Sequence, residues 1–186
     1  MKTNHPPPDS SIPRRDALRR LALLTGAALS LPVQAALRGE TLNGNPLHFS
    51  AGEQTLIAEL AEVVMPATNT PGAKAAGVGG FIEHVIGHCS DLKQQETFRK
   101  GLQQTDALSQ ALFGKNFLQL GNPQRINVMA QLAKGEKPFF MSLRELTIVG
   151  YFTSETGATQ ALDYVAVPGR FQGDIPLKPG QRAWAT

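Results

Sequence analysis

Prolines and glycines divide most of this 186-residue chain into segments of helical length, and that spacing limits the possible folds more than any other feature of the sequence. Between these breaks, apolar residues recur three or four positions apart, which is the period of an amphipathic helix. The segments lack the alternation of apolar and polar residues that marks a strand with one buried face. The pattern therefore predicts an all-α fold, a small helical bundle.

The best-defined helix follows Ser50. Ser50 and Glu53 have the spacing of a capping box, and Pro66 ends the apolar stripe behind them. Residues 66–80 are rich in Pro and Gly and predict a loop, whereas residues 37–49 predict a loop or a short strand. Further helices are expected up to Cys89, from Asp91 to Gly114, from Asn122 as N-cap and Pro123 as first residue to Gly135, and from Phe139 to Gly150. Their predicted inward residues are Phe81, Ile82, Val85 and Ile86; Leu92, Phe98, Leu102, Leu108 and Leu112; Ile126, Met129, Ala130 and Ala133; and Phe139, Phe140, Leu143, Leu146 and Thr147.

From about residue 151 to its end the chain carries too many Gly and Pro residues for a long helix. This irregular C-terminal tail is nevertheless apolar and aromatic, so it has to pack on its own bundle or on another protein. The sequence leaves both alternatives open. The predicted partner-contact residues are Tyr151, Phe152, Pro168, Gly169, Phe171 and Trp184. The other apolar residues of the tail are not assigned a contact: Leu162, Tyr164, Val165, Val167 and Ile175.

Residues 1–35 have the layout of a signal peptide. Arg14 and Arg15 precede an apolar run from Leu21 to Leu31, and a small-residue end at Ala35 is the predicted cleavage site. The run has about 11 residues where a bilayer span needs about 20, so it predicts no anchor. Adjacent arginines before a weakly hydrophobic run resemble a twin-arginine signal, and an ordinary secretory leader is the alternative. We therefore expect residues 36–186 to form a periplasmic helical domain whose first partner is the twin-arginine translocase.

The net charge of +3 comes from this leader. Five of the 18 basic residues and two of the 15 acidic residues precede Leu37, which leaves the remaining chain formally neutral. A neutral domain lacks the basic surface that nucleic-acid binding requires, so no nucleic-acid partner is expected. Cys89 is the only cysteine and is expected to be a small buried residue, with a disulfide to a partner chain as the alternative.

The sequence predicts no catalytic, cofactor-binding or metal-binding residue. It has no dinucleotide-binding glycine pattern after a strand, no P-loop, no haem-attachment motif and no nucleophile elbow. His84 and His88 lie four residues apart and could share one face of a helix, but no third or fourth metal ligand is evident beside them. A surface or hydrogen-bonded role is the preferred interpretation of both histidines.

Two stretches in combination carry a family resemblance. The first is MPATNTPGAKAAGV, residues 65–78, and the second is ELTIVGYFTSETGA, residues 145–158, with Pro168-Gly169-Arg170-Phe171 downstream. Together with the twin-arginine-like leader they resemble the gluconate 2-dehydrogenase subunit 3 family, over nearly all of residues 50–180. A free-standing extracytoplasmic helical ligand-binding protein is the alternative function.

The resemblance implies a small helical subunit of a sugar or polyol dehydrogenase. In such complexes a large subunit holds FAD and oxidises the substrate, and a cytochrome c subunit with haem c is a further partner. The small subunit has no assigned catalytic residue and is thought to stabilise the flavoprotein and to accompany it through the twin-arginine route. That role agrees with an export signal on a domain without cofactor motifs.

Overall fold

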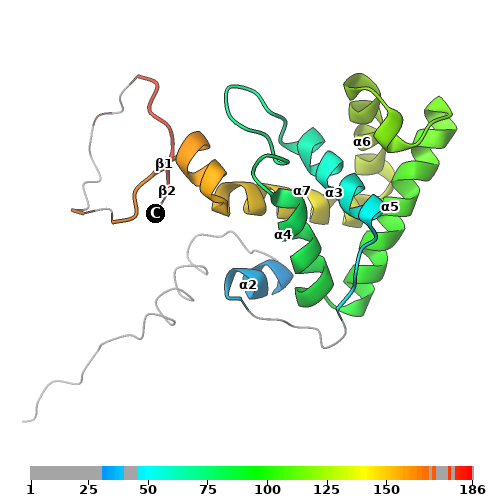
Figure 1. Ribbon diagram of the computed structural model, residues 1–186, viewed down its shortest axis with the longest axis horizontal. Coiled ribbons are helices and arrows are strands. Elements are labelled where there is room, and N and C mark those ends of the chain that lie inside the picture. The colour runs from blue at the N-terminus through cyan, green and yellow to red at the C-terminus, as the bar shows by residue number, and fades with distance from the viewer. Residues whose placement is uncertain (1–30, 40–45, 168, 171–175, 177–178, 186) are drawn as a thin grey trace, which may run out of the picture. The chain divides into compact units, whose positions relative to one another are not determined.

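The computed structural model describes residues 31–39, 46–167, 169–170, 176 and 179–185. The described chain is mostly helical, which confirms the all-α prediction (Figure 1). The helices are α2 (Leu31–Leu37), α3 (Ala51–Val64), α4 (Val78–His84), η1 (Val85–Cys89), α5 (Leu92–Phe113), η2 (Phe117–Gln119), α6 (Asn122–Gly135), α7 (Lys137–Thr153) and η3 (Gly157–Ala161). Two strands of two residues each, β1 (Asp163–Tyr164) and β2 (Trp184–Ala185), form one short parallel pair.

Several helix ends follow from local sequence, as predicted. The Ser50 side chain accepts the backbone N–H of Glu53, and the Glu53 carboxylate accepts the Ser50 N–H, so the capping box at the start of α3 is confirmed. Asp91 and Gln94 form the same reciprocal pair at the start of α5. Gly114 ends α5 in the left-handed conformation, with φ of 65°. The start of α6 differs by one residue, because Gly121 is its N-cap and Asn122 already lies in the helix.

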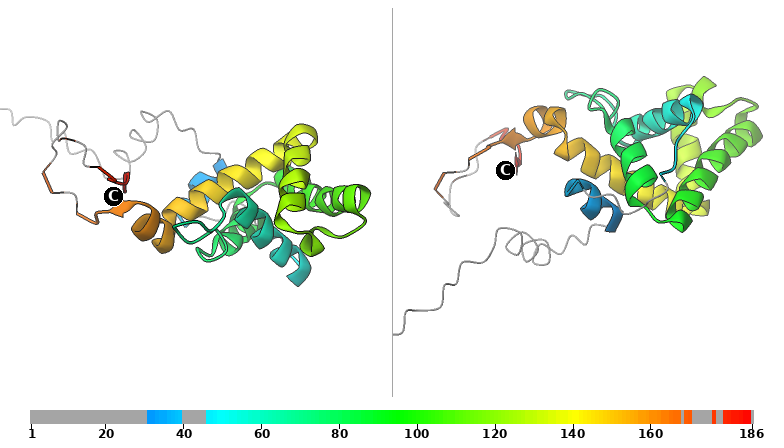
Figure 2. Two further views of the ribbon diagram at one scale, coloured as in Figure 1. Left: turned by 90° about the horizontal axis from the view of Figure 1, so that it is seen from above. Right: turned by 60° about the horizontal axis from the view of Figure 1, so that its bottom comes forward.

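Helix α7 is the centre of the bundle. It contacts α3, α4, α5 and α6, and its C-terminal end leads through η3 to the β1–β2 pair, on the side away from α5 and α6 (Figures 1 and 2). Phe139, near its start, is fully buried and meets the ring of Phe98 edge to face at 5.1 Å. Near its other end Gly150 leaves room for Phe81 of α4, because a Cβ at Gly150 would lie 2.6 Å from that ring.

The buried faces of α5 and α6 differ from the predicted ones. Leu92 and Leu112 are exposed, and so is Ile126, at 59%. The buried stripe of α5 combines Phe98 and Leu102 with polar residues that hydrogen-bond to nearby carbonyls: Gln95 to Gly87, Thr105 to Gly101, and Ser109 to Thr105. In α6 the stripe is Val128, Met129 and Leu132. A count of apolar residues misplaces the buried face of α5 because it assigns satisfied polar residues to the solvent side.

Two boundaries also differ from the sequence expectations. Helix α7 continues to Thr153, past the point where the irregular tail was expected to begin. Residues Leu31–Leu37, expected to contain the end of the leader and the start of a loop, form α2, which packs on η1. The predicted loop over residues 66–80 is confirmed as far as Gly77, and α4 begins at the next residue, Val78. Cys89 is buried, as expected.

The packing of α5 on α7 predicts opposite effects for two helical glycines. A Cβ added at Gly101 would overlap the ring of Phe139, whereas a Cβ at Gly52 of α3 would meet nothing within 4 Å. Gly101→Ala should therefore lower the free energy of unfolding by about 1–3 kcal/mol. Gly52→Ala, the matched control, should be neutral or raise it by up to about 1 kcal/mol. Urea denaturation of both variants measures the difference, and equal stability of the two would contradict the packing described here.

Candidate functional site

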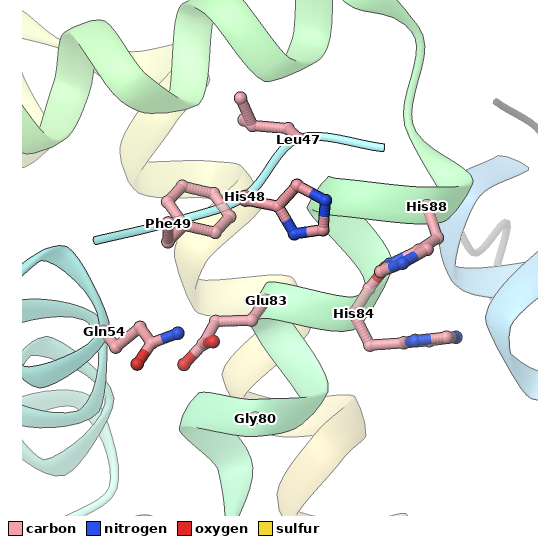
Figure 3. A pocket seen from close by; sticks show the side chains of 8 residues that line it. All are labelled: Leu47, His48, Phe49, Gln54, Gly80, Glu83, His84 and His88. Carbon is pink, nitrogen blue, oxygen red and sulfur yellow. The ribbon is translucent and has the colours of Figure 1, made fainter. Parts of the chain in front are cut away.

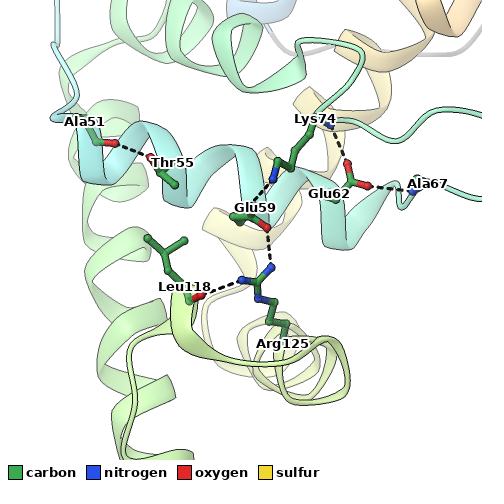
Figure 4. A network of polar contacts seen from close by, with 8 residues as sticks. All are labelled: Ala51, Thr55, Glu59, Glu62, Ala67, Lys74, Leu118 and Arg125. Atoms are coloured by element: carbon green, nitrogen blue, oxygen red, sulfur yellow. Dashed lines mark hydrogen bonds and ion pairs between the residues drawn. The ribbon is translucent and has the colours of Figure 1, made fainter.

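The loop between α3 and α4 is held in place by a carboxylate of α3. Glu62 accepts the backbone N–H of Ala67 at 3.0 Å with one oxygen and that of Lys74 at 2.8 Å with the other (Figure 4). Gly72 lies against this carboxylate, and a Cβ there would overlap it and approach the Ala67 nitrogen to 2.6 Å. Only glycine fits at this position, so the Pro-Gly-Ala-Lys stretch wraps around Glu62 as a structural turn.

A second carboxylate, one turn earlier on α3, joins this loop to α6. Glu59 pairs with Lys74 at 2.5 Å and with Arg125 at 2.6 Å, and both side chains of the Glu59–Arg125 pair are largely buried (Figure 4). Arg125 also donates to the Leu118 carbonyl at 3.0 Å, and its guanidinium lies 5.5 Å from the centre of the Phe117 ring. The arginine is thus held by charge, hydrogen bond and ring contact together.

Tyr151 joins the same loop to α7, and this corrects the expectation that it contacts a partner. Its side chain is 2% exposed, and its hydroxyl donates to the Pro71 carbonyl at 2.7 Å. The ring completes the domain's own core, which is the alternative that the sequence left open. The turn after Tyr151 is equally tight: the Ser154 hydroxyl donates to the Tyr151 carbonyl at 2.6 Å, and a Cβ at Gly157 would overlap that carbonyl.

The tail beyond η3 is anchored at both ends. Strand β1 pairs with β2, so Asp163 lies beside Trp184 and Tyr164 beside Ala185. Arg182 forms an ion pair with Asp163 at 3.0 Å and donates to the Gln160 carbonyl. Large apolar side chains remain exposed on and next to this pair, with Trp184 at 57%. We call this group the tail patch: Tyr164, Val165, Val167 and Trp184.

The predicted partner-contact residues fall into three groups. Trp184 and Gly169 are exposed, and Phe152 is exposed at the end of α7, with its ring against Tyr151. Tyr151 is buried, as described above. Pro168 and Phe171 lie outside the described residues. The structure adds Tyr164, Val165 and Val167, whose apolar character was visible in the sequence but whose exposure was not.

The leader residues are described only at their end. Arg14 and Arg15 lie outside the described residues, so the twin-arginine signal stays a prediction. Ala35 lies in α2 and is buried.

A shallow pocket of about 220 Å³ opens beside α4 and η1 (Figure 3). Burial raises the pKa of Glu83 above its ordinary value, and a hydrogen bond with Gln54 offsets part of this effect. The rings of His84 and His88 stack with their centres 4.8 Å apart and point away from Glu83 (Figure 3). The lining residues are Leu47, His48, Phe49, Gln54, Gly80, Glu83, His84 and His88.

This arrangement does not assemble a ligand set. Within the described residues no group of three or more His, Cys, Asp or Glu side chains is placed to hold a metal ion. The Nδ1 atom of His88 lies 3.3 Å from the His84 carbonyl oxygen, so this ring nitrogen is engaged in a contact with the preceding helical turn. Among the residues that the structure describes, no helix has both the length and the hydrophobicity to cross a membrane.

Comparison with known protein families matches residues 51–169 to gluconate 2-dehydrogenase subunit 3. The chain belongs to this family. The matched range begins at the first residue of α3 and ends just after the strand β1. Neither curated proteins nor solved structures yield a match. Membership of the subunit 3 family implies association with a larger dehydrogenase complex.

The stretches on which the family resemblance rests have structural roles in this subunit 3 protein. Residues 65–78 form the loop around Glu62, and Gly72 allows the close approach. Residues 145–158 supply Tyr151, which holds that loop, and the turn that ends α7. The sequence could not reveal the Glu59–Arg125 pair, because its members are 66 residues apart and neither carries a local signal.

The Glu59 network predicts a pH-dependent stability. Burial would raise the pKa of Glu59, but hydrogen bonds and charges from Lys74 and Arg125 outweigh it and lower the pKa below its ordinary value of 4.5. A carboxyl group whose pKa is lower in the folded chain than in the unfolded chain stabilises the fold at pH values above its unfolded-state pKa. This stabilisation is lost as the pH falls below about 4.5 and passes the pKa of the folded state. Glu59→Gln should therefore lower the free energy of unfolding at pH 7 by about 1–3 kcal/mol and flatten its decline in acid.

The control is Glu96→Gln, which removes an exposed carboxylate of α5. Its stability should stay within about 0.5 kcal/mol of the parent chain at pH 7. Denaturant titrations at pH 7, 5 and 4 compare the three proteins, and an unchanged pH profile in Glu59→Gln would refute the network's contribution.

Proposed function

We propose that this chain is the non-catalytic small subunit of a flavin-dependent dehydrogenase complex that oxidises a sugar, a sugar acid or a polyol. In this proposal it stabilises the large FAD-containing subunit and escorts it through the twin-arginine translocase to the periplasm. FAD, and haem c where a cytochrome c subunit is present, are expected in the partner subunits. The observation that carries the proposal is the family match over residues 51–169, which spans the chain from α3 to β1.

The tail patch supports a protein partner. Trp184 and Tyr164 are large aromatic residues, and both are more than half exposed. Pairing of β1 with β2 and the Arg182–Asp163 ion pair already fix the backbone beneath them. A pre-ordered surface loses little further entropy on binding, and exposed Trp and Tyr residues are the side chains that most often dominate binding energy at interfaces. We therefore assign the tail patch to the large subunit.

The leader supports the escort role. A twin-arginine-type signal directs folded proteins, and this chain's signal would serve a flavoprotein that has to fold around FAD before export. The bundle is suited to such transport, because hydrogen bonds tie together α3, α6, α7 and the loop after α3.

The tail assignment predicts a separation of binding from stability. Trp184→Ala should weaken association with the large subunit by about fivefold or more, which corresponds to about 1 kcal/mol, while the melting temperature stays close to that of the parent. Tyr151→Phe should do the opposite, because it removes the hydrogen bond to Pro71 in the core and costs about 1 kcal/mol of stability. Co-expression with the large subunit, affinity capture and thermal melting measure both effects.

The matched control for the patch is Leu112→Ala. Leu112 is a similarly exposed apolar residue on α5, at the end of the bundle away from β1 and β2 (Figure 1). Its loss should leave capture of the large subunit unchanged. If Trp184→Ala and Leu112→Ala bind equally well, the tail patch is not the interface.

The leader assignment predicts that Arg14→Lys combined with Arg15→Lys leaves the chain in the cytoplasm together with the large subunit. Lysine keeps the positive charge but lacks the planar guanidinium that the translocase receptor reads. Cell fractionation with activity staining of the dehydrogenase measures both proteins. Export of the double variant, or export of the flavoprotein without it, would contradict the escort role.

A further inference from the structure

The predicted cleavage site of the leader is part of the folded domain. Ala35 and Val33 occupy the last and third-last positions before the predicted cut, where a signal peptidase recognises small side chains. In the structure these two residues lie in α2 and both are buried, with Val33 at 0% and Ala35 at 3% exposure. Leu31, on the same helix, is 74% exposed. The side chains that the peptidase would need face the protein interior.

Helix α2 depends on that packing. It has seven residues, and an isolated helix of this length is not stable in water. It contacts η1, whose residues Val85, Ile86, Gly87 and Cys89 are all buried with α2 in place. The compact unit of the chain accordingly begins at Leu31 and runs to Thr186. Helix α2 is thus a part of the bundle that precedes the range matched to the family.

Folding therefore protects the bond after Ala35. Proteases cut exposed segments that can unfold locally. A buried site in a helix is therefore cut only after that helix opens. A chain exported unfolded would present Ala35 freely. A chain exported in the folded state, which is the route in the proposed function, presents α2 docked on η1.

We propose that residues Leu31–Leu37 remain in the mature protein as a structural helix, and that the leader is not removed at Ala35. Processing, where it takes place, leaves an N-terminus at or before Leu31. Helix α2 then continues to cover η1 in the exported subunit. This inference rests on the proposed function in one respect only, which is that the chain folds before the signal peptidase acts on it.

The first test is the N-terminus of the exported protein. Intact mass and N-terminal sequencing of the subunit purified from the periplasm of its host should give a chain that begins at or before Leu31. A chain that begins at any later residue, Ala36 in particular, would overturn the inference. That result would leave the proposed function standing, because export and capture of the large subunit are measured separately.

The second test compares one sequence in two states. The full chain is incubated with purified signal peptidase in detergent, either folded or unfolded in urea that the peptidase tolerates. We expect release of the Ala36 end to be at least about tenfold slower from the folded chain, or absent from both. Equal release from the two states would show that α2 does not protect the bond.

The third test measures the docking of α2 directly in the full chain. Val33→Asn places an amide at a fully buried position and should lower the melting temperature by about 3 °C or more. Leu31→Asn is the matched control on the exposed side of the same helix and should leave the melting temperature unchanged. Equal melting of the two variants would overturn the inference, whatever the route of export.

Discussion

Two carboxylates of α3 tie this helix to the loop that follows it and to α6. Glu59 and Glu62 lie three residues apart, so both face the loop that follows the helix. Glu62 holds the loop through two backbone N–H groups, and Glu59 joins it to α6 through Lys74 and Arg125 (Figure 4). The Tyr151 hydroxyl of α7 donates to the Pro71 carbonyl and so ties α7 to the same loop. Segments far apart in the chain thus meet at one loop, and Gly72 is needed there because the loop wraps so closely around Glu62.

This arrangement separates what holds the domain together from what it offers to other molecules. The stretches that identify the family are used for internal contacts, and Tyr151 shows the distinction clearly. The tail patch lies elsewhere, on and next to the β1–β2 pair that an ion pair keeps in place. An accessory subunit needs this combination, because it has to be rigid by itself and still present apolar area to a partner.

Helix α2 shows that the folded domain begins before the range matched to the family. The family match begins at Ala51, yet the compact unit begins at Leu31, so α2 is an addition to the matched bundle. Its burial on η1 places the end of the leader inside the fold. In the processing proposed above, packing of α2 decides where the predicted leader ends as much as the small residues that a peptidase recognises.

The sequence by itself determined the fold class and most helix ends. Ser50 with Glu53, Asp91 with Gln94, and Gly114 act within one turn of chain, so their effects can be read locally. The sequence also predicted the family and Trp184 as a candidate contact. It could not place Thr105 inside, because a polar side chain that bonds to its own helix is buried at little cost. Only the tertiary structure decided that Tyr151 belongs to the core, that Glu59 meets Arg125 and that Val33 is covered by η1, since each depends on groups brought together from distant parts of the chain.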